Sequence, residues 1–421
     1  MPIVFDQTNV EEYESRRAQV MGAFSPATPV TDHALFAGRS VEMTKVMDVV
    51  SQTGRHAVIY GERGVGKTSL ARVMSQILQD RCLALYYTCS TMDSYGDIWQ
   101  GLLEDAKVVS LHHRAGFTGE YERIIESATK FLGGKDPTPN NVRQTLRILS
   151  SSRPLLVLID EFDRIQESDT QRLFADSIKI LSDQAIPATL VLVGAGDTID
   201  ELIAEHASVQ RSLLQIRMPR MSSEEIARII WNGMATAGMQ AERGFVREVI
   251  NLSQGLPHYA HLLSQHAAWG ALLEGRLLVR TNDFTWAIAK SLDDTFHSVR
   301  ETYYRATNSA RETLHGKVLL ACALTKKDDL QTFSAPDVRQ ELRLITRQQY
   351  ELPRFATHLH DFCAPASEPR GGVLRRSGTA RRFRYKFSDP LLGPYVIMKG
   401  KAEGLIPPFS PSKFSSASSW S

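Results

Sequence analysis

Short apolar runs alternate with segments of helical periodicity through the first half of this chain. Four runs cover Ala57–Tyr60, Leu83–Tyr87, Pro154–Ile159 and Thr189–Gly194, and a fifth strand is expected to end near Ile216. Continuous apolar runs are typical of parallel strands whose two faces are both covered. Strands that alternate with helices favour a parallel sheet with crossover helices. The pattern therefore predicts an α/β fold.

The segments between these runs are expected to be helical. Apolar spacing in Val41–Met47 predicts a helix, and a second helix begins at about Leu70. The long segment from about Tyr95 to Leu149 is expected to be mostly helical, with an interruption at Gly133–Pro137. The first 29 residues show little periodicity and are expected to form an arm, or a short helix from Val10 to Met21.

The second half of the chain changes character. Ser222 and Glu225 have the spacing of a capping box, which predicts the start of a helical lid. A helix over residues 282–307 is expected to lead to three further helices (312–324, 334–345 and 348–362) and two strand-like pieces, an order that predicts a winged helix. The predicted division is an N-terminal arm (1–29), an α/β core (30–221), a lid (222–281), a linker helix (282–309), a winged-helix domain (310–400) and a disordered tail (401–421).

Composition narrows the class of protein. The 421 residues are 43% hydrophobic and 23% charged, with a formal net charge of +2, which is typical of a globular protein without an overall cationic surface. Any nucleic-acid surface must therefore be local. The four cysteines lie far apart, without metal-ligand spacing, as expected of free thiols in a reducing compartment. No apolar run approaches membrane-spanning length, so we expect a cytoplasmic protein without a membrane partner.

A phosphate-binding motif follows the first apolar run. Residues Gly61, Glu62, Arg63, Gly64, Val65, Gly66, Lys67, Thr68 and Ser69 fit the spacing G-x-x-x-x-G-K-[ST] between a predicted strand and a predicted helix. Glycines let the backbone N–H groups surround a phosphate, and the helix dipole adds attraction. Lys67 is expected to reach the β- and γ-phosphates, and the Thr68 hydroxyl is a candidate Mg²⁺ ligand. The motif predicts binding of a nucleoside triphosphate such as ATP.

Two acids follow the third apolar run. Asp160 and Glu161 come at the carboxyl end of the predicted strand, which is where open α/β sheets bind ligands. Asp160 is expected to hold Mg²⁺ through water, opposite Thr68. Glu161 is expected to polarise the water that attacks the γ-phosphate. The pair forms a Walker B element, and together with the phosphate loop it predicts hydrolysis as well as binding.

Arginines gather in the predicted C-terminal hairpin. The expected nucleic-acid contacts are Arg375, Arg376, Arg381, Arg382, Arg384 and Lys386. Alternation in residues 382–387 predicts cations on one face and aromatic side chains on the other. A cationic face on a projecting hairpin favours contact with the phosphates of duplex DNA. The alternative is a solubilising charged face, but such a face usually mixes both signs and this hairpin has no acid.

These motifs together resemble an AAA+ or STAND-type P-loop ATPase of the origin-recognition initiator branch. Phe36, Gly38 and Arg39 resemble the box that covers adenine in these families, although plain helix packing explains them too. Asp197 and Thr198 come where a first sensor is expected but match it poorly. Pro257 and His258 resemble the second sensor, with histidine in place of arginine. The resemblance makes Arg211 an arginine-finger candidate; a surface ion pair is the alternative.

The resemblance implies a five-stranded parallel sheet, a helical lid, ATP with Mg²⁺, and a homo-oligomer. Two functions stay open. The first is an ATP-hydrolysing switch or motor that grips duplex DNA through a winged helix, with filament formation on DNA as one variant. The second is a STAND-like signalling or defence ATPase whose winged helix regulates assembly and which recruits an effector protein without binding DNA itself.

Overall fold

The computed structural model describes residues 7–29, 38–113, 121–134, 136–196, 209, 211–308, 314–379 and 382–407, with the side chains of 7–10 and 109–125 left aside. The chain divides into two compact units, which are considered separately: residues 28–220, and residues 1–27 together with 221–421. In the part of the chain described, no helix combines the length and apolarity needed to cross a bilayer.

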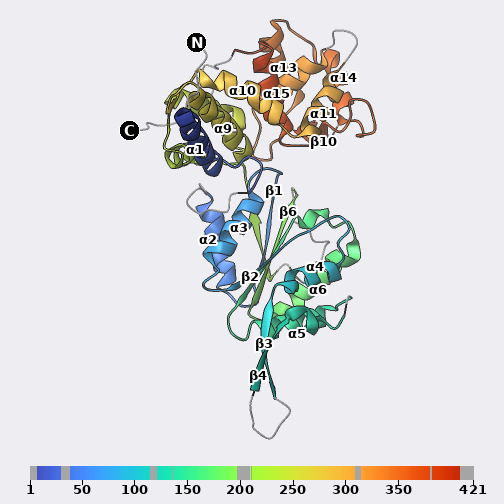
Figure 1. Ribbon diagram of the computed structural model, residues 1–421. Coiled ribbons are helices and arrows are strands. Elements are labelled where there is room, and N and C mark those ends of the chain that lie inside the picture. The colour runs from blue at the N-terminus through green and yellow to red at the C-terminus, as the bar shows by residue number, and fades with distance from the viewer. Residues whose placement is uncertain are drawn as a thin grey trace. The chain divides into compact units, whose positions relative to one another are not determined.

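The unit of residues 28–220 is built on a parallel sheet of five strands among the described residues, in the order β2-β5-β6-β1-β7 (Figure 1). The strands are β1 His56–Gly61, β2 Leu83–Thr88, β5 Leu155–Asp160, β6 Ala188–Ala195 and β7 Leu213–Arg217. All six residues of β5 are buried, as the apolar run predicted. The expectation of a five-stranded parallel sheet is confirmed.

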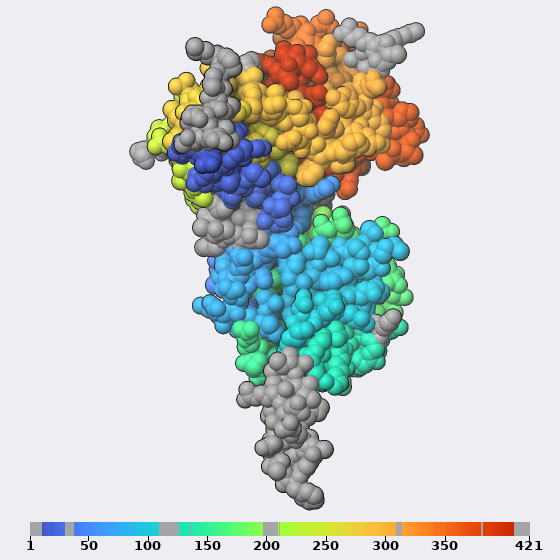
Figure 2. Space-filling view, in the orientation of Figure 1, coloured from blue at the N-terminus to red at the C-terminus, as the bar shows by residue number. Residues whose placement is uncertain are grey.

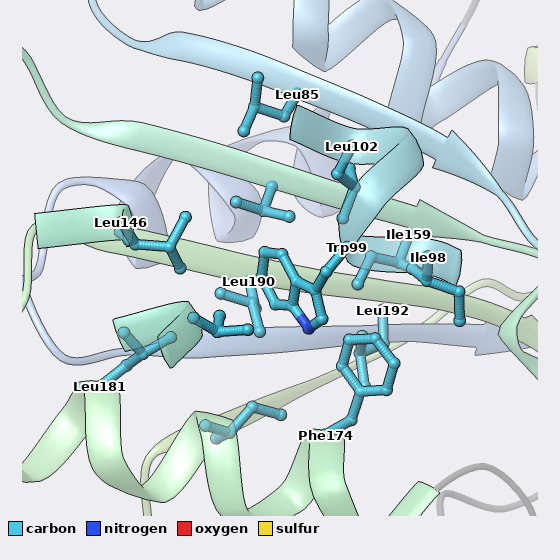
Figure 3. Close-up of a cluster of buried hydrophobic side chains, with 14 of the residues drawn as sticks. Leu85, Ile98, Trp99, Leu102, Leu146, Ile159, Phe174, Leu181, Leu190 and Leu192 are labelled. Atoms are coloured by element: carbon cyan, nitrogen blue, oxygen red, sulfur yellow. The ribbon is translucent and has the colours of Figure 1, made fainter. Parts of the chain in front are cut away.

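Helices cover both faces of this sheet. The helices are α2 Ser40–Val50 and α3 Lys67–Ile77 on one face, and α4 Tyr95–Glu104, α5 Pro139–Leu149 and α6 Ser168–Asp183 on the other (Figure 1). The core beneath α4, α5 and α6 centres on Trp99, whose ring stacks on Phe174 with 5.9 Å between ring centroids (Figure 3). Alternate residues of the strands fill this core, and their neighbours fill the core on the opposite face.

The segment between α4 and α5 differs from the helix that was expected. It contains the antiparallel strands β3 Lys107–His113 and β4 Tyr121–Ser127, followed by a short 3₁₀ helix, η1 Ala128–Leu132. The prediction of a mostly helical segment from Tyr95 to Leu149 is wrong over residues 107–113 and 121–127, which form strands. The sequences of β3 and β4 carry the β-branched pairs Val108–Val109 and Ile124–Ile125, which favour strands.

The other unit is mainly helical. It contains the helices α1 Gln7–Ala23, α7 Ser223–Thr236, α8 Arg243–Ser253, α9 Pro257–Leu273, α10 Asp283–Asp294, α11 His297–Thr307, α12 His315–Leu324, α13 Ala335–Thr346, α14 Leu352–Cys363 and α15 Leu392–Ala402. Its strands are the parallel pair β8 Gln240–Ala241 and β9 Leu278–Val279 and the antiparallel pair β10 Leu374–Ser377 and β11 Arg384–Phe387. The capping box of Ser222 and Glu225 is present at the start of α7.

Helix α1 is part of this helical unit and no isolated arm. It packs on α7 and α9, and Figure 2 shows it in dark blue against the yellow and yellow-green helices of the same unit. Phe24, just beyond α1, is fully buried, and the side-chain amide of Gln265 donates to its carbonyl oxygen at 2.8 Å. Sequence periodicity is weak in α1 because few of its residues face this contact.

Residues 282–307 form two helices, α10 and α11, where one was expected. The break falls at Thr295, which has extended backbone and donates its hydroxyl to the Ser291 carbonyl oxygen at 2.6 Å. Threonine side chains that bond to the preceding turn compete with the helical backbone. The sequence carries no proline or glycine at this point, so the break gives no signal of its own.

The C-terminal segment has the predicted order of elements. Helices α12, α13 and α14 are followed by the β10–β11 hairpin, and an antiparallel bridge joins Phe333, ahead of α13, to Tyr385 in β11. Helix α15 follows and packs on α8, α10, α11 and α12. This segment is therefore fused to the lid helices through α15. Its assignment as a winged helix stays a prediction.

Candidate functional site

The loop of residues 61–66 joins β1 to α3 and has the backbone that a phosphate loop needs. Gly61 has φ of +151°, and a Cβ there would lie 2.5 Å from the Met218 carbonyl oxygen. Gly66 has φ of +96° and precedes α3 without a side-chain cap. The first N–H groups of α3 therefore face the loop without a capping side chain, which is the arrangement that attracts anions at helix N-termini.

Lys67 lies across this loop. Its Nζ donates to the carbonyl oxygens of Gly61 at 2.9 Å and Glu62 at 2.8 Å. Burial lowers the pKa of Lys67 to about 8, while the carboxylates of Asp163, Asp160 and Glu62 act in the opposite direction. Asp160 and Asp163 come from the end of β5 and the turn after it, far along the chain, whereas Glu62 belongs to the loop itself. The fold thus brings the phosphate loop and the Walker B element to one place.

The sheet topology explains this meeting. Strands β1 and β5 both pair in parallel with β6, so their carboxyl ends lie at the same edge of the sheet. Asp160 is the last residue of β5 and is only 2% exposed. Its Oδ1 accepts from the Glu161 backbone N–H at 2.9 Å, and its Oδ2 accepts from the Tyr86 hydroxyl at 2.6 Å. A buried carboxylate is held here in one orientation.

Glu161 occupies unusual backbone. Its φ of +54° and ψ of +35° lie in the left-handed region, which disfavours residues other than glycine and is enriched at functional sites. Its carboxylate pairs with Arg164 at 3.0 Å, and its side chain is 42% exposed. The next acid, Asp163, accepts from the Ala195 N–H at the end of β6 at 2.7 Å. Glu161 therefore stands at the carboxyl edge of the sheet, within reach of solvent water.

Two arginines, Arg39 and Arg220, bond to the phosphate loop and connect it to other parts of the same unit. Arg39 is 2% exposed, and its guanidinium donates to the carbonyl oxygens of Val65 at 2.9 Å and Pro219 at 2.7 Å. Arg220 pairs with Glu62 at 2.7 Å, with both side chains 11% exposed. Both contacts tie the loop to the segment that follows β7. Arg39 was predicted as a nucleotide contact; its guanidinium bonds to the loop at Val65 and to Pro219 after β7, and it lies 3.9 Å from the Glu42 carboxylate. Its role toward the nucleotide stays a prediction.

Sequence reasoning did not identify Arg220 or Tyr86. Arg220 meets Glu62 across the fold, and Tyr86 meets Asp160 from the neighbouring strand. Neither pairing has a local spacing signal, because each depends on which strands lie side by side. One signal for the Arg220 pair was present in the sequence: Glu62 is an acid inside a loop that is expected to bind anions, so it needs a cation as partner.

Other predicted residues fall elsewhere. Phe36, Asp197, Thr198 and Arg381 lie outside the described residues. Gly38 has φ of +76° ahead of α2, whose N-cap is Arg39. Pro257 and His258 belong to the helical unit, where Pro257 starts α9 and the His258 ring stacks on Phe296 and bonds to the Pro26 carbonyl oxygen at 2.9 Å. Their role as a sensor stays a prediction.

Arg211 precedes β7 at the amino-terminal edge of the sheet. Its guanidinium pairs with Asp183 at 2.9 Å, and its side chain is 76% exposed. Because the phosphate loop follows the carboxyl end of β1, which is parallel to β7, Arg211 lies at the opposite edge from the loop of its own chain. A role in its own site is excluded by this placement. A role toward a neighbouring copy stays a prediction.

The arginines of the β10–β11 hairpin have different surroundings. Arg384 pairs with Asp328 and donates to the Thr332 hydroxyl at 2.8 Å, so this side chain is held within the fold. Arg376 lies over the Phe383 ring, 4.4 Å from its centroid. Arg375 stands opposite Lys386 in the hairpin, and both Arg375 and Arg382 are exposed. Arg376 is exposed as well, and the role of these cations as nucleic-acid contacts stays a prediction.

The donor set at the carboxyl edge fits one metal best. No group of three or more His, Cys, Asp or Glu side chains within the described ranges could hold a metal ion by itself. Mg²⁺ is commonly held by one or two protein oxygens together with waters and substrate phosphates. A hydroxyl at Thr68 and a carboxylate at Asp160 are oxygen ligands of this kind. The residues present therefore fit Mg²⁺ brought in with a phosphate ligand.

Residues 26–361 match the protein family described as Novel STAND NTPase 1. No curated protein matches the sequence. The chain is similar in structure to a Walker-type ATPase of Pyrococcus abyssi, with 14% identity, a TM-score of 0.50, and coverage of 88% of this chain and 98% of that one. The Aeropyrum pernix ORC1 protein in complex with DNA matches with 16% identity, a TM-score of 0.48, and coverage of 93% and 97%. Cdc6p from Pyrobaculum aerophilum matches with 15% identity, a TM-score of 0.44, and coverage of 92% and 99%.

The ion pairs of Arg220 and Arg211 differ in burial, so a comparison of the two tests how much burial adds to the contribution of an ion pair to stability. Replacing Arg220 with alanine should lower the free energy of unfolding by about 3 kcal/mol, because it leaves the Glu62 carboxylate buried without this cation. Replacing Arg211 with alanine removes an exposed pair of similar length and should cost less than about 1 kcal/mol. Urea denaturation of both variants measures the difference, and equal losses would contradict the structural role of Arg220.

Proposed function

This chain belongs to the Novel STAND NTPase 1 family, and from that premise we propose that it binds ATP with Mg²⁺ at the loop between β1 and α3 and hydrolyses it. One observation carries the proposal. Strands β1 and β5 both pair in parallel with β6, so the loop that leads to Lys67 and the carboxylate of Asp160 lie at the same edge of the sheet. The carboxylates of Asp163 and Asp160 accordingly oppose the lowering of the Lys67 pKa by burial. A cation for the phosphates and a carboxylate for the metal therefore converge at one edge of the sheet.

Binding would use the loop backbone and Lys67. The N–H groups at the start of α3 would surround the β-phosphate, where the helix dipole favours negative charge. The Lys67 ammonium already bonds to loop carbonyls, and phosphate oxygens would replace these partners. Added negative charge beside Nζ would raise the pKa of Lys67 from about 8 and keep it protonated.

Hydrolysis would use Glu161 as the general base. Mg²⁺, held at Thr68 and Asp160, would supply Lewis-acid stabilisation of charge on the phosphate oxygens. The Glu161 carboxylate would take a proton from a water molecule whose oxygen attacks the γ-phosphorus, while the bond from that phosphorus to the β–γ bridging oxygen breaks. The products are ADP and phosphate, and the proton passes from Glu161 to solvent. The carboxylate must leave Arg164, with which it pairs at an exposed position, to reach the water.

The role of Glu161 can be tested by removing its charge alone. Glu161→Gln should keep ATP binding and lose at least about 100-fold in turnover, since general-base catalysis contributes about 10²–10⁴-fold. Glu104→Gln, an exposed position at the end of α4, is the control and should behave as wild type. Phosphate release measures turnover and a fluorescent ATP analogue measures binding. Wild-type turnover in Glu161→Gln would refute the assigned role.

We also propose that Arg211 acts on a neighbouring copy of this chain in a homo-oligomer. Support comes from its exposure and its place at the sheet edge away from its own phosphate loop. A guanidinium supplied to a developing phosphoryl transition state accelerates hydrolysis strongly. The partner would need to compete only with Asp183, and exposed pairs of this kind are weak.

The trans role of Arg211 predicts a dependence on protein concentration. Wild-type turnover per molecule should rise with concentration, whereas Arg211→Ala should stay at the low value of the dilute protein. Asp183→Ala removes the competing partner and should not lower turnover. Steady-state phosphate release across a concentration series measures both effects. Arg211→Ala turnover that equals wild type at every concentration would leave Arg211 as a surface residue.

A further part of the proposal is that the chain associates with duplex DNA through the β10–β11 hairpin. Support comes from exposed Arg375 and Arg382 and from Lys386 opposite Arg375, with no acid in the sequence of residues 374–387. Arg339 and Arg343 add exposed cations on α13. Arg384 is held by Asp328 and is left out of this surface. Such contacts would go mainly to phosphates and would be sensitive to salt.

Charge reversal tests the DNA contact. The double variant Arg375→Glu/Arg382→Glu should bind duplex DNA at least about tenfold more weakly and reduce the slope of log affinity against log salt by about 2, one for each lost phosphate contact. The control is Arg147→Glu/Arg172→Glu, which reverses two exposed arginines of the other unit. Fluorescence anisotropy of a labelled duplex at several salt concentrations measures both. Equal losses in the two double variants would indicate non-specific charge attraction.

One observation favours the alternative, a STAND-like switch that recruits an effector protein and does not bind DNA itself. The C-terminal segment is packed against the lid: the Gln254 side chain donates to the Ala323 carbonyl oxygen at 2.9 Å, and the Tyr259 hydroxyl donates to the Leu391 carbonyl oxygen at 2.6 Å. Both residues flank the Gly255–Pro257 turn. A DNA signal that is absent or insensitive to salt, with ATP-dependent assembly retained, would support this alternative.

A further inference from the structure

We propose that Tyr86 is a positioning residue that holds Asp160 for the metal, and the inference rests on the Mg²⁺–ATP site proposed above. The Tyr86 hydroxyl donates to Oδ2 of Asp160 at 2.6 Å. The donor belongs to β2 and the acceptor to β5, which pair in parallel with Thr88 beside Asp160. A short hydrogen bond to a buried carboxylate restricts its rotation and is stronger than a bond between neutral groups.

The hydrogen bond from Tyr86 occupies one lone pair of the Asp160 carboxylate and leaves others for the metal. Oδ1 of Asp160 accepts from the Glu161 N–H, and Oδ2 accepts from Tyr86. Each carboxylate oxygen has a second acceptor position. With one donor on each oxygen, the carboxylate plane is set, so the remaining lone pairs have fixed directions. An outer partner of this kind is known to orient metal ligands and to tune their affinity for the metal.

Tyr86 is itself held by the helix that carries the other candidate ligand. The Arg72 guanidinium lies over the Tyr86 ring, 4.5 Å from its centroid. Arg72 is four residues after Thr68 in α3, so the two side chains lie on the same face of that helix. The series Arg72, Tyr86, Asp160 therefore connects the helix of Thr68 to the strand of Asp160. It would set the spacing between the two oxygen ligands.

The neighbouring tyrosine provides a matched control. Tyr87 follows Tyr86 in β2, and its hydroxyl donates to Oδ2 of Asp93 at 3.1 Å. Consecutive residues of a strand point to opposite faces, so Tyr87 lies away from the Asp160 side chain. Tyr87→Phe removes the same atom as Tyr86→Phe and also breaks one hydrogen bond to an aspartate. The two variants differ in whether that aspartate is Asp160.

The experiment measures the Mg²⁺ concentration that gives half of the full increase in affinity for a fluorescent methylanthraniloyl-ATP. Tyr86→Phe should raise this midpoint about tenfold, at the low end of the loss seen when a partner of a metal ligand is removed. Affinity measured in EDTA should stay unchanged, because the phosphate loop and Lys67 do not depend on Tyr86. Tyr87→Phe should move neither value by more than about twofold. An unchanged or lower midpoint in Tyr86→Phe would overturn the inference.

A second variant separates positioning from packing. In an Asp160→Asn background, Tyr86→Phe should add nothing to the Mg²⁺ midpoint if it acts through the carboxylate, and an undiminished effect there would overturn the inference. The proposed function has its own readout. Wild type that binds no analogue refutes both proposals, whereas normal Mg²⁺ dependence in Tyr86→Phe, with turnover still lost in Glu161→Gln, refutes only the role of Tyr86.

Discussion

Parallel pairing of β1 and β5 with β6 is the constraint on which the candidate site depends. Parallel strands end at the same edge of a sheet, so residues that follow two of them meet however far apart they lie in sequence. Here the phosphate loop follows β1 and Asp160 ends β5, with one strand between them. A reversed or displaced strand would separate Lys67 from Asp160, and the site proposed here needs both.

The charged groups at this edge are held by other parts of the protein. Glu62 pairs with Arg220, Asp160 accepts from Tyr86, and Asp163 accepts from the backbone at the end of β6. Burial of a polar group lowers the stability of the fold unless the group has a partner. These contacts therefore allow charged side chains to be buried at this edge of the sheet. They also fix directions, and a preorganised set of donors and ligands is what phosphoryl transfer requires. Glu161 differs from these residues, because its carboxylate is partly exposed and pairs with Arg164, three residues along the chain.

The packing of helices within the helical unit connects the lid to the C-terminal segment, which bears on how the protein could work as a switch. Helix α1 packs on α7 and α9, and α15 packs on α8, α10 and α12. The lid helices and the C-terminal segment therefore form one packed body, with Gln254 and Tyr259 bonded to that segment beside the Gly255–Pro257 turn. A ligand on the basic hairpin and a change at this turn would act on the same compact unit. Both functions considered for this protein can use that connection.

The amino-acid sequence alone determined the strands of the sheet, the phosphate loop, the Walker B acids and the start of α7. These features depend on local causes: apolar runs that must be covered, glycines that permit left-handed backbone, and a capping box. The sequence-based prediction failed over residues 107–113 and 121–127, which form strands and not helix, and at Thr295, where a helix ends. The pairing of Arg384 with Asp328 had no signal in the sequence, because the two residues lie far apart along the chain.

Only the tertiary structure decided which residues became partners. The pairing of Tyr86 with Asp160 follows from the adjacency of β2 and β5, and that of Arg220 with Glu62 from the return of the chain after β7 to the end of β1. The same is true of Arg211, whose distance from its own site follows from strand direction. No periodicity or spacing in the sequence predicts such contacts, because they depend on the order of the strands in the sheet. Local sequence specifies which chemical groups are present, and the topology of the sheet specifies which of them meet.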